Sequence, residues 1–125
     1  MEFSSNQPIY LQVATWLEQQ IMEGKYQAGH KIPGVRDLAV TLIVSTRTVQ
    51  NAINQLVAND LIVTKRGQGN FVTEDLTKIN VIKADKKIAI TQKYIDNVMH
   101  VAEVNEIPEL VAHAIAAYDA QNREA

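Results

Sequence analysis

The chain has 125 residues, 46% of them hydrophobic, which suits one domain with a core, or a small domain with a short appendage. It has no cysteine, which excludes disulfides, zinc fingers and thiol nucleophiles. The formal net charge of -2 argues against a general nucleic-acid coat protein, because phosphate binding requires local positive charge. No long apolar run and no signal peptide is visible, so we expect a cytoplasmic protein with no membrane partner.

The basic residues are unevenly distributed along the chain. Residues 31–73 carry five basic and two acidic side chains, a balance of +3. Residues 74–125 carry six basic and nine acidic side chains, a balance of -3. Such a concentration of positive charge in one segment is what a DNA-contacting module requires.

The first part of the chain predicts a helix, a loop and a short second helix. Pro8 suits the first turn of a helix and Gly24 offers a stop, so the first helix spans about residues 8–23. Residues 25–34 contain two glycines and a proline and predict a loop with turns. The apolar spacing that follows predicts a short helix over residues 35–42.

A third helix is predicted directly after a tight turn. Ser45 is a suitable N-cap for a helix over residues 46–59. The apolar residues of this segment form one core-facing stripe, namely Val49, Ala52, Ile53, Leu56 and Val57. Two helices joined by a tight turn indicate a helix-turn-helix.

Two β-prone runs follow, over residues 61–64 and 70–73. The loop between them contains Gly67 and Gly69, so the runs predict a β-hairpin. A hairpin directly after the third helix is the wing of a winged helix.

The C-terminal part predicts two amphipathic helices, over residues 86–104 and 108–121. Residues 74–85 have no clear period and are either a linker or the start of a helix. Two such helices cannot bury both apolar faces alone, so we expect a homodimer; the alternative is a monomer whose tail packs on its own winged helix. The residues expected at the dimer interface are Ile88, Ile95, Met99, Ala102, Leu110, Val111, Ala114, Ile115 and Tyr118.

The third helix carries residue types that read DNA bases. When its apolar stripe faces inward, the outward residues are Arg47, Gln50, Asn51 and Asn54. Arginine can contact guanine in a bidentate manner, and asparagine or glutamine can contact adenine. The hydroxyl residues at the helix start, Ser45, Thr46 and Thr48, can hold phosphates there. The alternative is an ordinary solvated face.

The predicted wing supplies positive charge beside glycines. The wing residues expected to contact DNA are Lys65, Arg66, Gly67, Gln68 and Gly69. Glycine lets the backbone approach a groove without a Cβ clash, and Gln68 could reach the minor groove. Arg36 opens the second helix and is expected to bind phosphate; its alternative is a surface ion pair with Asp37 or another acid.

Residues 8–73 resemble the DNA-binding domain of the GntR family of bacterial transcriptional regulators. The resemblance lies in Pro8-Ile9-Tyr10 through Gly24, Ala28-Gly29-His30-Lys31-Ile32-Pro33-Gly34-Val35-Arg36-Asp37-Leu38-Ala39, Val44-Ser45-Thr46-Arg47-Thr48-Val49, Leu56-Val57-Ala58-Asn59-Asp60-Leu61 and Gly67-Gln68-Gly69-Asn70-Phe71-Val72. It implies that Arg36 contacts phosphate, that Ser45 and Thr48 contact the DNA backbone, and that Gly69 is the wing-tip glycine. The short tail after the wing resembles the YtrA subfamily, whose helical tail mainly dimerises.

Several positions depart from the family pattern. Gly34-Val35 replaces a frequent Ser-Glu, and Ile43 stands where the turn has a glycine. Thr46 stands where an arginine is usual, with Arg47 one step later, and Gln50 replaces another arginine. These changes bear on the operator sequence and not on the fold.

The resulting prediction is an α+β, mostly helical fold. A winged helix-turn-helix DNA-binding domain over residues 1–75 is followed by a short two-helix dimerisation or effector tail over residues 76–125. The implied function is that of a bacterial, cytoplasmic, sequence-specific regulator, most simply a dimeric repressor of a pseudo-palindromic double-stranded DNA operator. The alternatives are a winged helix used for protein–protein contact, and a repressor released by a small-molecule effector at the dimer interface.

Other chemistry has little support in the sequence. No nucleophile with a base partner and no phosphate-binding glycine loop is present, so we expect no enzyme and no cofactor. His100 and His113 lie on different predicted helices without ligand spacing, so we expect no metal, although either could combine with Glu103 or Glu109.

Overall fold

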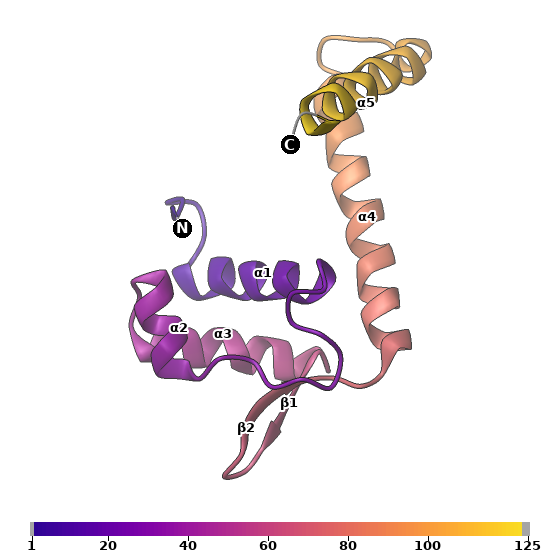
Figure 1. Cartoon of the computed structure of the whole chain (residues 1–125). Helices are drawn as coiled ribbons and strands as arrows, with labels where there is room; N and C mark the ends of the chain where they lie inside the picture. Colours follow the sequence, from indigo (N-terminus) through magenta and orange to yellow (C-terminus); the bar gives the residue numbers. More distant parts are fainter. Residues whose placement is uncertain (1, 124–125) are drawn as a thin grey trace. The chain divides into compact units, whose positions relative to one another are not determined.

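The computed structural model describes residues 2–123 and is mostly helical, with one two-stranded hairpin (Figure 1). Its elements in chain order are α1 (Ile9–Met22), α2 (Val35–Leu42), α3 (Thr46–Ala58), β1 (Ile62–Lys65), β2 (Gly69–Val72), α4 (Leu76–Val98), the 3-10 helix η1 (Val104–Glu106) and α5 (Ile107–Arg123). The predicted fold class is confirmed. The chain forms two compact units, the first ending at Lys83 and the second beginning at Ala84, within α4.

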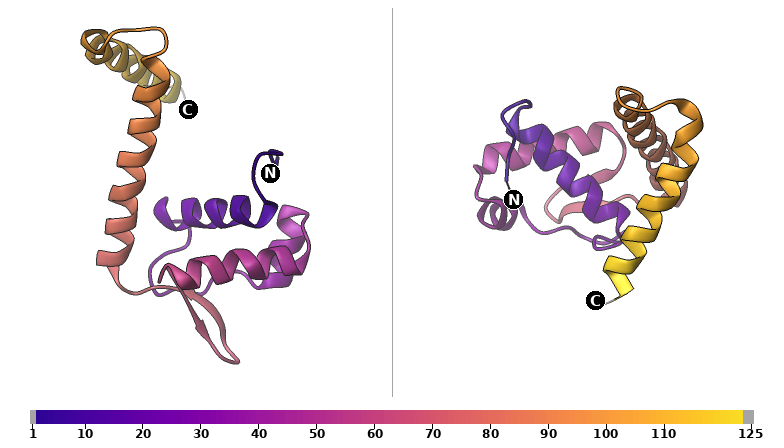
Figure 2. Two further views of the ribbon diagram at one scale, coloured as in Figure 1. Left: turned by 180° about the vertical axis from the view of Figure 1, so that it is seen from behind. Right: turned by 90° about the horizontal axis from the view of Figure 1, so that it is seen from above.

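The core of the first unit lies between α1, α2 and α3. The helices α1 and α3 lie side by side, and α2 packs against α3 (Figures 1 and 2). Their fully buried side chains include Leu17 of α1 and Ile53 and Leu56 of α3. Burying each of these side chains is worth about 1.5–3 kcal/mol, so the apolar stripes that predict the helices also hold them together.

One residue of the predicted stripe on α3 lies outside the core. Val57 is 36% exposed, whereas Val49, Ile53 and Leu56 are fully buried. Val57 lies in the last turn of α3, which ends at Ala58. Its inclusion in the core-facing stripe was therefore wrong.

A sharp turn separates α2 from α3. Ile43 caps α2 in the left-handed conformation, with φ 57 and ψ 53. The Val44 N–H donates to the Ala39 carbonyl at 3.0 Å, which closes the end of α2. The Ser45 side chain then accepts from the Thr48 N–H at 3.1 Å and caps α3, as predicted.

The wing is an antiparallel hairpin that projects away from the three helices (Figure 1). Its register pairs Ile62 with Val72 at the base. The loop after α1 pairs with β2 at one position, where Lys31 forms an antiparallel bridge with Phe71. Ile62 and Val72 are buried, so the base of the wing belongs to the core.

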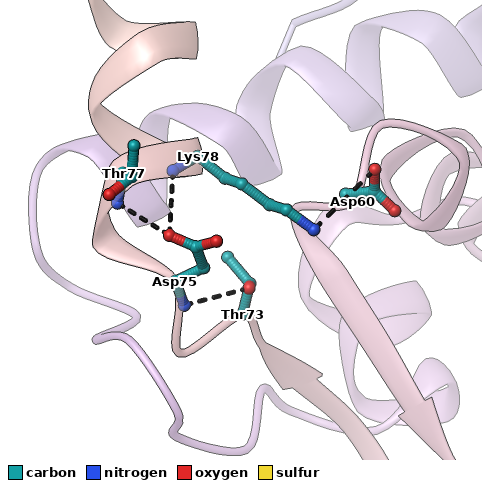
Figure 3. Close-up of polar contacts among 5 residues, drawn as sticks. All are labelled: Asp60, Thr73, Asp75, Thr77 and Lys78. Atoms are coloured by element: carbon teal, nitrogen blue, oxygen red, sulfur yellow. Dashed lines mark hydrogen bonds and ion pairs between the residues drawn. The ribbon is translucent and has the colours of Figure 1, made fainter.

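Helix α4 begins at Leu76, not near residue 86 as predicted, so residues 76–85 are the start of a helix and not a linker. Asp75 provides the cap: its Oδ1 accepts from the Thr77 N–H at 3.0 Å and the Lys78 N–H at 3.3 Å (Figure 3). Lys78 also lies 4.0 Å from Asp60 after α3, and Ile79 and Ile82, in the first two turns of α4, pack against the core.

The second unit contains the rest of α4, a turn, η1 and α5. Helix α4 ends at Val98, earlier than the predicted residue 104, and η1 carries a capping box between Glu103 and Glu106. Helices α4 and α5 contain no buried residue among those described. None of the described helices is long and apolar enough to cross a membrane. The predicted domain division after residue 75 falls just before α4 and stays a prediction.

Candidate DNA-binding surface

The outward face of α3 carries the four residues predicted to read bases. They follow one another at helical spacing, and all four side chains are exposed: Arg47, Gln50, Asn51 and Asn54. The opposite face of the same helix supplies Val49, Ile53 and Leu56 to the core. The packing of α3 therefore fixes which side chains face solvent, and hence which are available to a groove.

Two of the hydroxyl groups at the start of α3, those of Ser45 and Thr48, are hydrogen-bonded to each other. Ser45 Oγ lies 2.8 Å from Thr48 Oγ1 and accepts from the Thr48 N–H. Thr46 is exposed beside them. The positive end of the helix dipole and the free N–H groups of the first turn favour an anion at this place. Ser45 thus has a capping function in the folded chain in addition to its predicted phosphate contact.

The tip of the wing is exposed and basic. Lys65, Arg66, Gly67 and Gln68 are all exposed, and the Gln68 N–H donates to the Lys65 carbonyl at 2.9 Å to close the turn. Gly67 has φ 76, a conformation that glycine adopts without strain. Lys65 Nζ lies 4.5 Å from the centroid of the Phe71 ring, a cation–π contact that orients this charge.

Lys31 is a basic residue beside the wing that is not among the predicted DNA-contacting residues. Its side chain lies across Gly69, where a Cβ would be 2.6 Å from Lys31 Cε. Gly69 has φ 125, so its backbone conformation favours glycine, and a larger residue would also displace the end of the Lys31 side chain. Lys31 belongs to the loop after α1, and only its bridge to Phe71 brings it to the wing. No local sequence pattern predicts that long-range pairing.

Arg36 lies at the second position of α2 and is exposed. Across residues 2–123 it forms no ion pair, so the alternative of a pair with Asp37 is not observed. The guanidinium is available at the start of α2, where a phosphate contact is predicted.

A metal site finds no support in the geometry. Over the described part of the chain, no three His, Asp or Glu side chains gather closely enough to hold an ion. His113 lies in α5 as predicted, whereas His100 lies in the turn after α4 and not on a helix, because α4 ends at Val98.

Residues 9–72 match the model of the bacterial regulatory proteins of the gntR family. This match covers just over half of the chain and includes every residue of α1, α2, α3 and the wing. The chain belongs to the GntR family. The resemblance stated from the sequence is thus confirmed.

Two Bacillus subtilis proteins are similar to this GntR chain. It is 30% identical over 82 residues to an uncharacterized HTH-type transcriptional regulator, YhcF, covering 66% of this chain and 68% of YhcF. It is 34% identical over 71 residues to the HTH-type transcriptional repressor YtrA, covering 57% of this chain but only 55% of YtrA.

Solved structures extend the likeness to the tail. A GntR family transcriptional regulator from Listeria monocytogenes has a TM-score of 0.83 and 31% identity, over 89% of this chain and 98% of that one. The AraR DNA-binding domain, solved in complex with operator ORX1, has a TM-score of 0.55 and 31% identity, over 58% of this chain and 93% of that one. This GntR protein is a DNA-binding transcriptional regulator, and its family is one of regulators and not of enzymes.

Proposed function

We propose that this GntR protein is a homodimeric repressor that places α3 in the major groove of a pseudo-palindromic operator and the wing in an adjoining groove. The observation that carries the proposal is the exposed row of Arg47, Gln50, Asn51 and Asn54 beside a basic wing. The AraR complex supports the DNA partner, and the name of YtrA supports repression. Two-fold symmetry implies half-sites about one helical turn, ~10 bp, apart.

Arg47 and Arg36 are assigned different roles in this docking. Arg47 reads a base edge, so Arg47→Ala should weaken operator binding about 5- to 150-fold and relax one base position. Arg36 binds phosphate, so Arg36→Ala should weaken binding to operator and random DNA alike. Fluorescence anisotropy with both duplexes separates the two effects. Wild-type affinity of both variants for both duplexes would contradict the docking.

The exposed apolar residues of α4 and α5 support a partner chain. Ile88, Ile115 and Tyr118 are 65%, 56% and 66% exposed in the single chain. Apolar side chains repeated along two helices are stabilised when a second copy covers them. Analytical ultracentrifugation should give a dimer for wild type and a folded monomer for the double variant Ile88→Glu, Ile115→Glu. A wild-type monomer at micromolar concentration would contradict the proposal.

A small effector at the dimer interface remains part of the proposal only as a modulator. Ile88 and Ile95, which are expected at the dimer interface, line a hollow on α4 together with Lys87 and Asp96, and a second copy would cover a ligand held there. Operator binding does not depend on it.

A further inference from the structure

Two amides on the outward face of α3 are joined by a hydrogen bond. Gln50 Nε2 donates to Asn54 Oδ1 at 2.9 Å. The two residues are one helical turn apart, and both side chains are exposed. The hydrogen bond couples the orientations of the two amides on the face assigned to the major groove.

We propose that Gln50 and Asn54 act as one unit that reads a single A·T base pair. This inference rests on the proposed function and specifies what that surface recognises. Each amide has one acceptor oxygen and one NH2 group with two donor hydrogens. The shared bond uses one hydrogen of Gln50 and one lone pair of Asn54. The joined amides therefore offer an acceptor, a donor, an acceptor and a donor in sequence.

This alternation matches only one kind of base-pair edge. In the major groove an A·T pair presents an acceptor (N7), a donor (N6) and an acceptor (O4). The donor, acceptor and donor formed by Gln50 Nε2, Asn54 Oδ1 and Asn54 Nδ2 are its complement. A G·C pair presents two adjacent acceptors and then a donor, so an amide oxygen would face a base acceptor unless the Gln50–Asn54 bond broke. Turning over both amides reverses the order and keeps the alternation.

The three groups of the A·T edge are an acceptor, a donor and an acceptor, so their order is the same from either end. The paired amides therefore separate A·T and T·A pairs from G·C and C·G pairs more strongly than they separate A·T from T·A. Only the thymine methyl group distinguishes the latter two. The two amides must also act together, since removing either one removes the alternating row.

The test starts from the full chain and a random duplex pool, from which the bound sequence is selected. Dissociation constants are then measured for that sequence with each of the four base pairs at each position. The proteins compared are wild type, Gln50→Ala, Asn54→Ala, the double variant, and Gln55→Ala as a control. Gln55 is also exposed on α3 but outside the proposed reading face. Thermal unfolding of each variant shows that it is folded.

For wild type, one position should lose about 5- to 150-fold in affinity when A·T becomes G·C, and much less when it becomes T·A. Gln50→Ala and Asn54→Ala should each abolish that preference at the same position, the double variant should add nothing, and Gln55→Ala should retain the preference. The pairing is overturned if the two single variants relax different positions, or if wild type prefers G·C there. A pool that yields no enriched sequence would overturn the proposed operator recognition itself, and this inference with it.

Discussion

Ile43 has a backbone conformation that β-branched residues rarely adopt, with φ 57 and ψ 53 at the turn between α2 and α3. A non-glycine residue in this region costs about 1–2 kcal/mol, and asparagine tolerates it better. The Ile43 side chain is 89% exposed, so replacing it loses little buried area. We expect Ile43→Asn to raise the free energy of unfolding by about 1 kcal/mol in urea denaturation.

A matched control for this prediction is Val40→Asn. Val40 is 79% exposed within α2, where the backbone is an ordinary helix, and the two residue types have similar helix propensities. Val40→Asn should change stability by less than about 0.5 kcal/mol. If the two variants were equally stable, the left-handed backbone conformation of Ile43 would not be strained.

Lys31 should contribute one phosphate contact through the wing. Its exposed ammonium lies beside Gly69 at the base of the wing tip. Lys31→Ala should reduce the slope of log affinity against log salt by about 1 and leave base preference unchanged. Lys25→Ala is the control, because Lys25 pairs with Glu23 at 3.2 Å after α1. A slope that falls equally in both variants would place the contact elsewhere.

Tyr26 makes stability sensitive to alkaline pH. Its ring is partly buried against Trp16, with centroids 6.4 Å apart, and burial raises the pKa of the Tyr26 hydroxyl. The raised pKa means that the folded state favours the protonated phenol. Its stabilising contribution is complete below the unfolded pKa of about 10 and is lost as pH rises above that value through the folded pKa.

Tyr26→Phe should therefore lessen the fall in unfolding free energy above pH 10. Denaturant unfolding at a series of pH values between pH 9 and pH 11 measures this fall in unfolding free energy. The assignment fails if Tyr26→Phe follows the wild-type curve.

At the scale of elements, local patterns predict α1, α2, α3 and the wing because each has its own signals. Ser45 caps α3, and the glycines flank the hairpin turn. Helix α4 starts earlier than predicted because Asp75 caps a first turn that is irregular in hydropathy. Val57 follows the apolar period but lies where α3 leaves the core. The position of Lys31 beside the wing depends on its pairing with Phe71, which is forty residues away in the sequence. No local pattern contains that pairing.

The Asp75 cap gives a prediction at this scale. Asp75→Ala leaves two N–H groups at the start of α4 without their acceptor, so unfolding free energy should fall by about 1 kcal/mol. Helix content measured by circular dichroism should fall with it, while Asp75→Asn should retain both. Asp85→Ala, within α4 and exposed, is the control. An Asp75→Ala variant as stable as Asp85→Ala would show that the cap is not what starts the helix.

At the scale of the whole molecule, a net charge of -2 coexists with DNA binding because the positive charges are local. Arg36 and Arg47 lie on the helix-turn-helix, and Lys31, Lys65 and Arg66 lie on the wing. The acidic tail carries the exposed apolar residues that a second copy would cover. The proposed dimer would place two such basic surfaces on one duplex, and a two-fold symmetric site with a steep salt dependence would follow from it.

The most direct test of sequence-specific DNA binding is a salt titration of the full chain on its selected operator and on a scrambled duplex. We predict that the operator binds at least about 10³-fold more tightly and that both affinities fall steeply between 50 and 200 mM salt. Equal affinity for the two duplexes, or affinity that does not change with salt, would contradict the account and favour a winged helix used for protein–protein contact.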